Sequence, residues 1–308
     1  MKGEWKIILI DYNQVATSAI LAFSDELKNK SQSEAKNIIR HSILNALRSH
    51  NLKYRRDYGD MVITCDGQNY WRRTFFPAYK GLRKKARDES DLDWGFIHEG
   101  LHEIREDLAK YFPYRVIRYD RAESDDVYGI LAMMTHEFFC FEPVVVITSD
   151  KDAKQLLKYD NVIQFSPMLK KQIRLTKKEL YEWMITHIVK GDAGDGVPSI
   201  MSEDNFFMNE DRGRQKSISA KRLQEFFDQG IGACRDDLER ARYQRNQTLV
   251  DFEFIPDDVR AEVIEMYDNY EVKRDLNEVF NYLVKHRCRN LLDNLQDFWN
   301  IFGANYDW

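Results

Sequence analysis

The chain has 308 residues and a 43% apolar fraction, which is enough for a core in one large domain or two modest ones. Its first apolar run is too short for a signal peptide or a membrane span, so we predict a cytoplasmic protein. The four cysteines are dispersed without a CxxC pair, which argues against a zinc ribbon and a disulfide framework. The formal net charge of −5 argues against a nucleic-acid partner unless the charges are segregated.

Four short runs rich in Val and Ile predict β-strands, and each of them ends at an aspartate. They are KIILID at 6–11, MVITCD at 61–66, YRVIRYD at 114–120 and VVVITSD at 144–150. The intervals between them have helical periodicity, which is clearest at 33–50 and 101–112. Alternating strands and helices predict an α/β fold with a mainly parallel central sheet and helices on both faces.

The four aspartates at the ends of these runs are Asp11, Asp66, Asp120 and Asp150. Because the carboxyl ends of parallel strands open onto one crevice, we expect these side chains to lie near one another. Each aspartate taken alone could simply cap the helix that follows it. Four carboxylates in one crevice repel one another unless cations lie among them, which favours a metal site.

Further acids are predicted at the same edge of the sheet. A helix with Ser124 as its predicted N-cap carries three acids at its start, and another carboxylate follows Asp150 by two residues. A helix with a Thr176–Glu179 capping box ends at Gly191 and leads two more aspartates into the loop KGDAGDGVPSI. The alternative role of the first three acids is to complement a helix dipole. These acids are Glu123, Asp125, Asp126, Asp152, Asp192 and Asp195.

A ligand set made of oxygen atoms, with no Cys and no required His, favours two Mg²⁺ ions over zinc, with Mn²⁺ as a substitute. Two such ions suit phosphoryl displacement, because one activates water and the other stabilises the leaving oxygen. The loop KGDAGDGVPSI itself stays open to three interpretations, namely a carboxylate loop, a phosphate-binding turn or a plain turn between helices.

The stretch WRRTFFPAYKGLRKKAR at 71–87 is basic, contains no acid and interleaves its cations with aromatic rings. This combination is what a single strand passing an active site would require, whereas the alternative is a solvated charged helix. A later stretch offers Lys216 and Lys221 to backbone phosphates, or serves only solubility. The predicted nucleic-acid-binding residues of the first stretch are Arg72, Arg73, Tyr79, Lys80, Arg83, Lys84, Lys85 and Arg87.

Two motifs point elsewhere and are not favoured. HEGLH at 98–102 matches the HExxH of zinc peptidases, but Gly100 weakens the helix that such a site needs. GDAGDG resembles the acidic loop of haloacid-dehalogenase-type phosphatases. Those enzymes need Asp-x-Asp after the first strand, where this chain has Asp11, Tyr12 and Asn13.

In their order and spacing, several motifs resemble the structure-specific 5′ nucleases, the family that includes flap endonucleases, and most of all its bacteriophage ribonuclease H members. The motifs are LIDYNQ, TCDGQNYWRR, AYKGLRKKAR, AESDD, ITSDKDAKQL, FSPM, KGDAGDGVPS and LVDFEFIPDDV. The resemblance spans nearly the whole chain. It implies a 5′-nuclease or PIN-like core at 1–190 with a basic helical arch at about 66–93. A mostly helical region at 191–308 would begin with a helix-three-turn-helix element that grips duplex DNA.

The resemblance also implies roles for individual residues. The first Mg²⁺ would be surrounded by Asp11, Asp66, Glu123, Asp125 and Asp150, and the second by Asp152, Asp192 and Asp195. Arg72 and Lys80 would bind and polarise the scissile phosphate, while Asp120 and Asp126 would stand outside the direct ligands. Gly194, Gly196 and Val197 would approach duplex phosphates. Relatives hold a K⁺ ion in this element, where the family pattern has an Asn at the position of Gly196.

The implied function is a magnesium-dependent nuclease that cuts RNA–DNA hybrid and duplex or flap DNA from 5′ ends. It would remove RNA primers during lagging-strand replication, as a monomer without a membrane partner, in the host cytoplasm if viral. The aromatic stretch at 298–308 would dock on the protein's own core or bind a partner such as a single-stranded DNA-binding protein or a sliding clamp. Two alternatives stay open: a non-catalytic binder of branched DNA, and a magnesium-dependent phosphatase on small esters.

Overall fold

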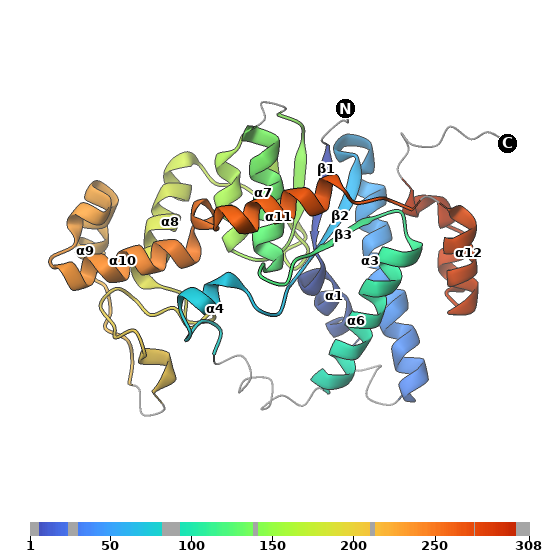
Figure 1. Cartoon of the computed structure of the whole chain (residues 1–308), viewed down its shortest axis with the longest axis horizontal. Coiled ribbons are helices and arrows are strands. Elements are labelled where there is room, and N and C mark those ends of the chain that lie inside the picture. The colour runs from blue at the N-terminus through green and yellow to red at the C-terminus, as the bar shows by residue number, and fades with distance from the viewer. Residues whose placement is uncertain are drawn as a thin grey trace.

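The computed structural model describes residues 6–23, 30–81, 93–137, 141–209, 213–273 and 275–299 (Figure 1). The strands are β1 (Ile7–Asp11), β2 (Asp60–Cys65), β3 (Arg115–Arg118), β4 (Val144–Ile147), β5 (Val162–Ser166) and β6 (Lys171–Ile173). The α-helices are α1 (Tyr12–Leu21), α3 (Gln32–Tyr58), α4 (Trp71–Phe75), α6 (Trp94–Tyr111), α7 (Ser124–Glu137), α8 (Lys177–Lys190), α9 (Ala220–Gln229), α10 (Asp237–Val250), α11 (Asp257–Asp268), α12 (Leu276–Lys285) and α13 (Arg289–Leu292). A 3-10 helix, η1 (Asp152–Lys158), follows β4.

The described strands form one sheet in the order β3-β2-β1-β4-β5-β6, and all neighbours are parallel except β5 and β6. The four strands predicted from Val- and Ile-rich runs are confirmed as β1 to β4. The prediction missed β5, which carries the polar Gln164 inside it, and the three-residue β6. The Gln164 amide donates to the carbonyls of Thr148 (3.1 Å) and Asp150 (2.8 Å), so this strand braces the loop that ends in acids.

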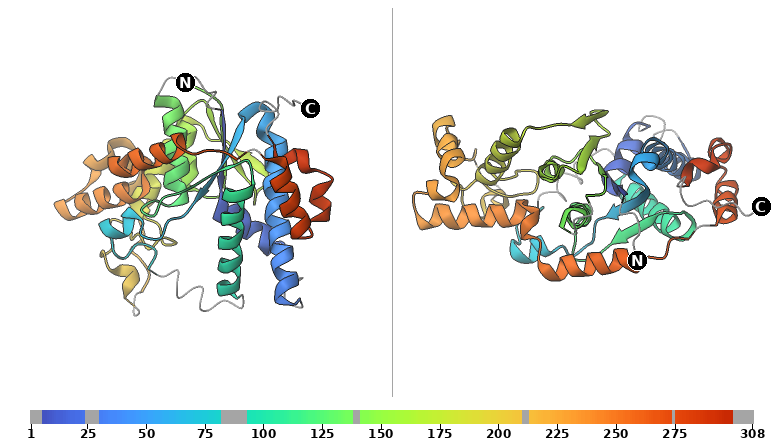
Figure 2. Two further views of the ribbon diagram at one scale, coloured as in Figure 1. Left: turned by 45° about the vertical axis from the view of Figure 1, so that its right-hand side comes forward. Right: turned by 90° about the horizontal axis from the view of Figure 1, so that it is seen from above.

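Helices cover both faces of the sheet, as predicted (Figure 2). Ile8 and Ile10 of β1 pack into the larger core with α1, α3, α6 and α12, while Ile7 and Leu9 pack into the second core with α7 and α11. Successive side chains of a strand point to opposite faces, so a strand buried on both sides requires a continuous apolar run. The sequence IILI meets that requirement and places Asp11 at the open end of the strand.

A third, smaller core joins α8, α9 and α10 at one end of the molecule (Figure 1). It contains Ile188, Phe226 and Tyr243, all of them buried. Helix α8 begins with the predicted Thr176–Glu179 capping box and ends at Gly191, whose φ of 70° suits glycine. The mainly parallel sheet and the mostly helical C-terminal region together confirm the predicted fold class.

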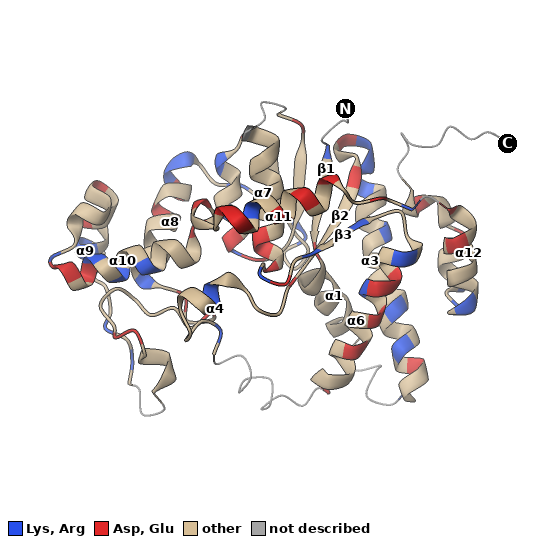
Figure 3. Cartoon of the chain, viewed as in Figure 1, with Lys and Arg blue, Asp and Glu red and all other residues tan. Residues whose placement is uncertain are grey.

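Part of the predicted basic arch at 66–93 lies outside the described residues, including Arg83, Lys84, Lys85 and Arg87. Its described portion contains α4 and a turn that reaches Gly81. Of the aromatic stretch at 298–308, Phe298 is buried in the larger core, and residues 300–308 lie outside the described part. In Figure 3, basic and acidic residues both lie on α3, α6 and α12, whereas α1 carries neither. Within the described residues, no helix combines the length and apolar character needed to cross a membrane.

Candidate metal centre at the sheet edge

Asp11 ends the central strand β1 and is buried. One carboxylate oxygen accepts from the Thr148 hydroxyl at 3.0 Å, and the other accepts from the Gln14 amide (3.2 Å) and the Ser124 hydroxyl (3.3 Å). Burial, together with the negative charges of Asp66 and Asp150, raises the pKa of Asp11 to about 7. The raised pKa of Asp11 therefore reflects acids from three strand ends that lie close together, as predicted.

Asp66 follows β2 and lies against the start of α7. Its carboxylate accepts from the Ser124 amide (2.8 Å) and from the Asn13 side chain (2.6 Å). The prediction that Ser124 is an N-cap is wrong, because Ser124 is the first residue of α7. The Ser124 hydroxyl instead contacts Asp11 and the Thr64 carbonyl (3.0 Å), so it links two strand ends.

Glu123, Asp125 and Asp126 form one of two groups of described residues whose ligand atoms could hold a metal ion. Burial raises the pKa of Glu123, although the ion pair with Lys80 and the ion pair with Arg72 oppose that shift. Burial and the charge of Glu123 raise the pKa of Asp125 well above its usual range. The group therefore carries more negative charge than its two protein cations balance.

Arg72 lies inside the protein, which differs from the predicted contact with the scissile phosphate. The residue is 1% exposed, and its guanidinium pairs with Glu123 (3.0 Å) and Asp126 (2.7 Å) and donates to the Leu249 carbonyl (2.8 Å). The other oxygen of Asp126 accepts from the Trp71 ring at 3.1 Å. Arg72 thus holds the start of α7 from within, because two ion pairs and a hydrogen bond to a backbone carbonyl fix its guanidinium.

Lys80 joins this group to the glycine-rich loop. Its ammonium contacts Glu123 and lies 3.8 Å from a carboxylate oxygen of Asp195, while its backbone amide donates to the Asp195 carbonyl at 2.7 Å. The φ angle of Lys80 is 56°, which is uncommon for a residue with a side chain. Tyr79 is buried and donates its hydroxyl to Asp195 at 3.0 Å.

The remaining predicted ligands lie around the loop after β4 and the loop after α8. Burial and the charge of Asp152 raise the pKa of Asp150 to about 6, and one Asp150 oxygen accepts from the Asp152 amide at 2.8 Å. Asp192 accepts from the Gly194 amide at 2.9 Å and pairs with Lys151 at 2.8 Å. Asp152 and Asp192 belong to the second potential metal group, whose third member was not predicted.

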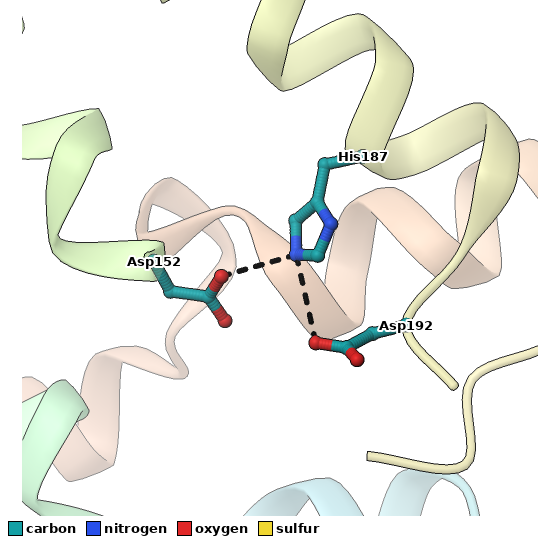
Figure 4. Close-up of side chains that lie close together, drawn as sticks. All are labelled: Asp152, His187 and Asp192. Carbon is teal, nitrogen blue, oxygen red and sulfur yellow. Dashed lines mark ion pairs between the residues drawn. The ribbon is translucent and has the colours of Figure 1, made fainter. Parts of the chain in front are cut away.

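That third member is His187, in the last turn of α8 (Figure 4). Its Nε2 atom lies 3.1 Å from Asp152 and 3.9 Å from Asp192. The sequence analysis missed it because a buried histidine beside Ile185 and Ile188 fits the apolar stripe of a helix. A possible signal was its position five residues before the aspartate of the glycine-rich loop.

Asp120 does not join either acidic group. It accepts from the Gln68 amide (3.2 Å) and from the Asn69 side chain (2.8 Å), and so it fixes the loop after β2. The HEGLH motif likewise forms no site among the described residues, because His98 and His102 are both exposed on α6. Gly100 of this motif is buried against Ile39, which gives the glycine a packing role.

The opening of KGDAGDGVPSI forms a tight loop closed by hydrogen bonds between Asp192 and Val197 (2.7 and 2.8 Å). Gly191 has no room for a Cβ atom, which would lie 2.3 Å from the Val197 carbonyl. Gly196 has a φ of 72°, and its Cβ would lie 3.0 Å from the Ala78 carbonyl. The backbone conformation and the close approach of residues 78–80 thus explain a glycine at this position.

The described residues that were predicted to contact nucleic acid include both exposed and buried ones. Exposed residues are Arg73, Gly194, Lys216 and Lys221, whereas Tyr79, Gly196 and Val197 are buried. Buried side chains such as Tyr79 act through the residues they hold, whereas the exposed ones are available to a ligand. The predicted contacts themselves stay predictions.

The donor set of this centre fits divalent cations. Its carboxylate oxygens are hard donors of the kind that Mg²⁺ and Mn²⁺ prefer. The pKa values of Asp11 and Asp150, raised to about 7 and about 6, reflect buried like charges that a cation would stabilise. The predicted residues of both ion sites, together with Lys80, therefore line one edge of the sheet.

Comparison with known proteins supports the family resemblance. The N-terminal resolvase-like domain of 5′-3′ exonucleases matches residues 6–184, and the C-terminal domain of T4 RNase H matches residues 181–298. Ribonuclease H of Enterobacteria phage T4 is 31% identical over an alignment that covers 95% of this chain and 95% of that protein.

Solved structures agree at the level of the fold. A phage T5 protein co-crystallised with metal ions has a TM-score of 0.60 at 17% identity, over 86% of this chain and 99% of that one. A phage T5 flap endonuclease in complex with DNA and metal ions has a TM-score of 0.57 at 17% identity, over 94% and 99%. The family-model match and the 31% identity to the T4 enzyme show that the chain belongs to the 5′-3′ exonuclease family of nucleases, alongside phage ribonuclease H.

Proposed function

We propose that this protein is a metal-dependent 5′ to 3′ nuclease that hydrolyses RNA–DNA hybrid and duplex or flap DNA with two Mg²⁺ ions, or Mn²⁺ in their place. One observation carries the proposal: carboxylates from separate strand ends, from the start of α7 and from the loop after α8 converge at one edge of the sheet. Their raised pKa values favour bound cations as the charges that balance them.

The proposed ligands fall into two sets. The first is Asp11, Asp66, Glu123, Asp125 and Asp150, and the second is Asp152, Asp192 and Asp195. Bound divalent ions would supply an activated water and stabilise the leaving oxygen. Lys80 contacts Glu123 and approaches Asp195, so it holds a positive charge between the sets where a phosphate would lie. Arg72 acts indirectly, because it fixes Glu123 and Asp126 from inside the protein.

We also propose the biological setting that the relatives suggest. The T4 relative is named ribonuclease H, and a fold relative from phage T5 is a flap endonuclease solved with DNA. In this proposal, both kinds of cleavage would serve the removal of RNA primers from lagging-strand fragments. In this proposal the α/β core at 1–190 carries the chemistry, and the region at 191–308 grips the downstream duplex through its exposed lysines.

The test is product mapping on hybrid and flap substrates labelled at the 5′ or 3′ end, with and without Mg²⁺. We expect short products released from the 5′ side in Mg²⁺ alone. Asp150→Asn should reduce cleavage by roughly 1000-fold while DNA binding is retained, because the change removes a ligand charge and no predicted DNA contact. Binding without any Mg²⁺-dependent cleavage would favour a branched-DNA binder instead. Unchanged turnover in Asp150→Asn would refute the assigned centre.

A further inference from the structure

The ring of His187 lies between two acids that come from different loops (Figure 4). Helix α8 carries His187, while Asp152 starts η1 and Asp192 follows the end of α8. The Nε2 atom of His187 is 3.1 Å from Oδ1 of Asp152 and 3.9 Å from Oδ2 of Asp192. One nitrogen and two carboxylate oxygens thus converge from three positions.

The facing atoms of His187 and Asp152 lack hydrogen-bond partners within the described part of the chain. His187 is only 7% exposed, and both its Nε2 atom and Oδ1 of Asp152 are buried without a hydrogen bond of acceptable geometry. Leaving a buried polar atom unsatisfied costs about 1–3 kcal/mol. Stacking on Trp183, with ring centroids 5.4 Å apart, keeps the imidazole in this orientation. Two unsatisfied atoms that face each other indicate a shared partner between them.

The spacing and the charges fit a divalent cation as that partner. Two ligand atoms bound at right angles to an ion with bonds of about 2.1 Å are about 3 Å apart, close to the separation of His187 and Asp152. Oδ2 of Asp192 already attracts a cation, the ammonium of Lys151, at 2.8 Å. Lys151 is 47% exposed on its side chain, so its flexible amine can move into solvent when another cation binds.

We propose that His187 supplies a nitrogen ligand to the second cation site, together with Asp152 and Asp192, and gives that site a preference for Mn²⁺ over Mg²⁺. Imidazole nitrogen is a better ligand for transition-metal ions than for Mg²⁺, which prefers oxygen and retains its water. This inference changes the expected oxygen-only ligand set. Its importance for cleavage rests on the proposed function, whereas the metal binding does not.

The experiment measures binding to the full chain by pulsed electron paramagnetic resonance of Mn²⁺, a readout separate from nuclease activity. We expect hyperfine coupling from a directly bound nitrogen, and its replacement by ¹⁵N coupling when histidine alone is ¹⁵N-labelled. His187→Ala should abolish the coupling and weaken Mn²⁺ binding at one site by at least about tenfold in calorimetry. Mg²⁺ affinity should change less than about threefold.

A matched control is His41→Ala, because His41 on α3 also has a buried Nε2 atom without a hydrogen bond among the described residues but belongs to neither acidic group. This variant should keep the nitrogen coupling. Absence of nitrogen coupling in the labelled wild-type protein with both sites filled would overturn the inference, even if His187→Ala fails to fold. Equal losses of Mn²⁺ and Mg²⁺ affinity in His187→Ala would also overturn it. Nitrogen coupling without any nuclease activity would leave the inference standing and remove only the proposed function.

Discussion

The two acidic groups at the sheet edge differ in the charges that balance them. The group of Glu123, Asp125 and Asp126 contains the buried cations Arg72 and Lys80. Among the described residues, the group of Asp152 and Asp192 is paired with the half-exposed Lys151, and His187 faces both acids. The buried cations Arg72 and Lys80 are fixed parts of the folded protein. The exposed amine of Lys151, by contrast, can leave its carboxylate and be replaced by a cation from solution. One half of the centre is thus stabilised from within, and the other is open to exchange.

The acidic group with two buried cations is itself not fully neutralised. Even beside two cations, burial raises the pKa of Glu123, and burial with the charge of Glu123 raises that of Asp125. Breaking a buried ion pair leaves an uncompensated charge and is strongly destabilising, although an intact pair adds little net stability. We therefore expect that removing a buried cation, Arg72 or Lys80, lowers the free energy of unfolding. Binding of a divalent cation from solution should change the free energy of unfolding by an amount that depends on pH.

The largest effect is expected from Arg72→Met, which removes a buried positive charge from the first acidic group and so tests whether that group depends on it. Glu123 and Asp126 would lose their partner, so the free energy of unfolding should fall by about 3–5 kcal/mol in urea titrations without metal. The control is Arg73→Ala, because Arg73 is exposed and its guanidinium carbon lies 4.7 Å from the ring centroid of Tyr70. Its effect should stay within about 0.5 kcal/mol. Equal effects of the two variants would show that the buried network contributes nothing special.

A second effect, intermediate in size, concerns pH and magnesium. In the metal-free protein the pKa of Asp11 is about 7, above its usual value of 3.8. The folded state therefore binds a proton that the unfolded state lacks, so stability should rise as pH falls from about 8.5 to about 6.5. Below that window the pKa of His50, lowered to about 4 by burial, opposes the trend, because the unfolded state then takes up a proton.

Differential scanning calorimetry at several pH values checks this expectation. Without metal, the melting temperature should increase by a few degrees, roughly 2–4 °C per kcal/mol gained, between about pH 8.5 and about pH 6.5. Saturating Mg²⁺ should raise the melting temperature most at the alkaline end and flatten the profile. Asp11→Asn should be flatter without metal and should gain less from Mg²⁺. A wild-type profile that rises toward alkaline pH would contradict the role of Asp11.

Much of this architecture could be predicted from the sequence because burial on both faces of a parallel sheet forces apolar runs. The acids at the ends of those runs were identified for the same reason, and Asp11, Asp66 and Asp150 indeed come together. Strand β5 could not be predicted, since its Gln164 is buried for a hydrogen-bonding reason that periodicity does not reveal. The inward position of Arg72 depends on a carbonyl contributed by Leu249, 177 residues away.

His187 shows the same limit of prediction from local sequence. A histidine on the buried side of a helix looks like a core residue until tertiary structure brings Asp152 beside it. Serine is a common N-cap residue, yet the hydroxyl of Ser124 instead hydrogen-bonds to Asp11 and to the Thr64 carbonyl. Local preference predicts the helix start to within one residue, and the contacts across the sheet edge decide what the side chain does.

An effect of comparable size is expected where the two halves meet, at Gly196. Its φ of 72° and its approach to the Ala78 carbonyl predict that Gly196→Ala lowers the free energy of unfolding by about 1–2 kcal/mol. Gly196→Asn should cost less, since asparagine tolerates left-handed backbone better than alanine and meets the same steric limit. Gly213→Ala is the control, because no atom of the described residues lies within 4 Å of its Cβ position. Equal losses of stability for Gly196→Ala and Gly196→Asn would contradict a requirement set by backbone conformation. They would show that glycine is needed only because of the steric contact between this loop and the turn that contains Lys80.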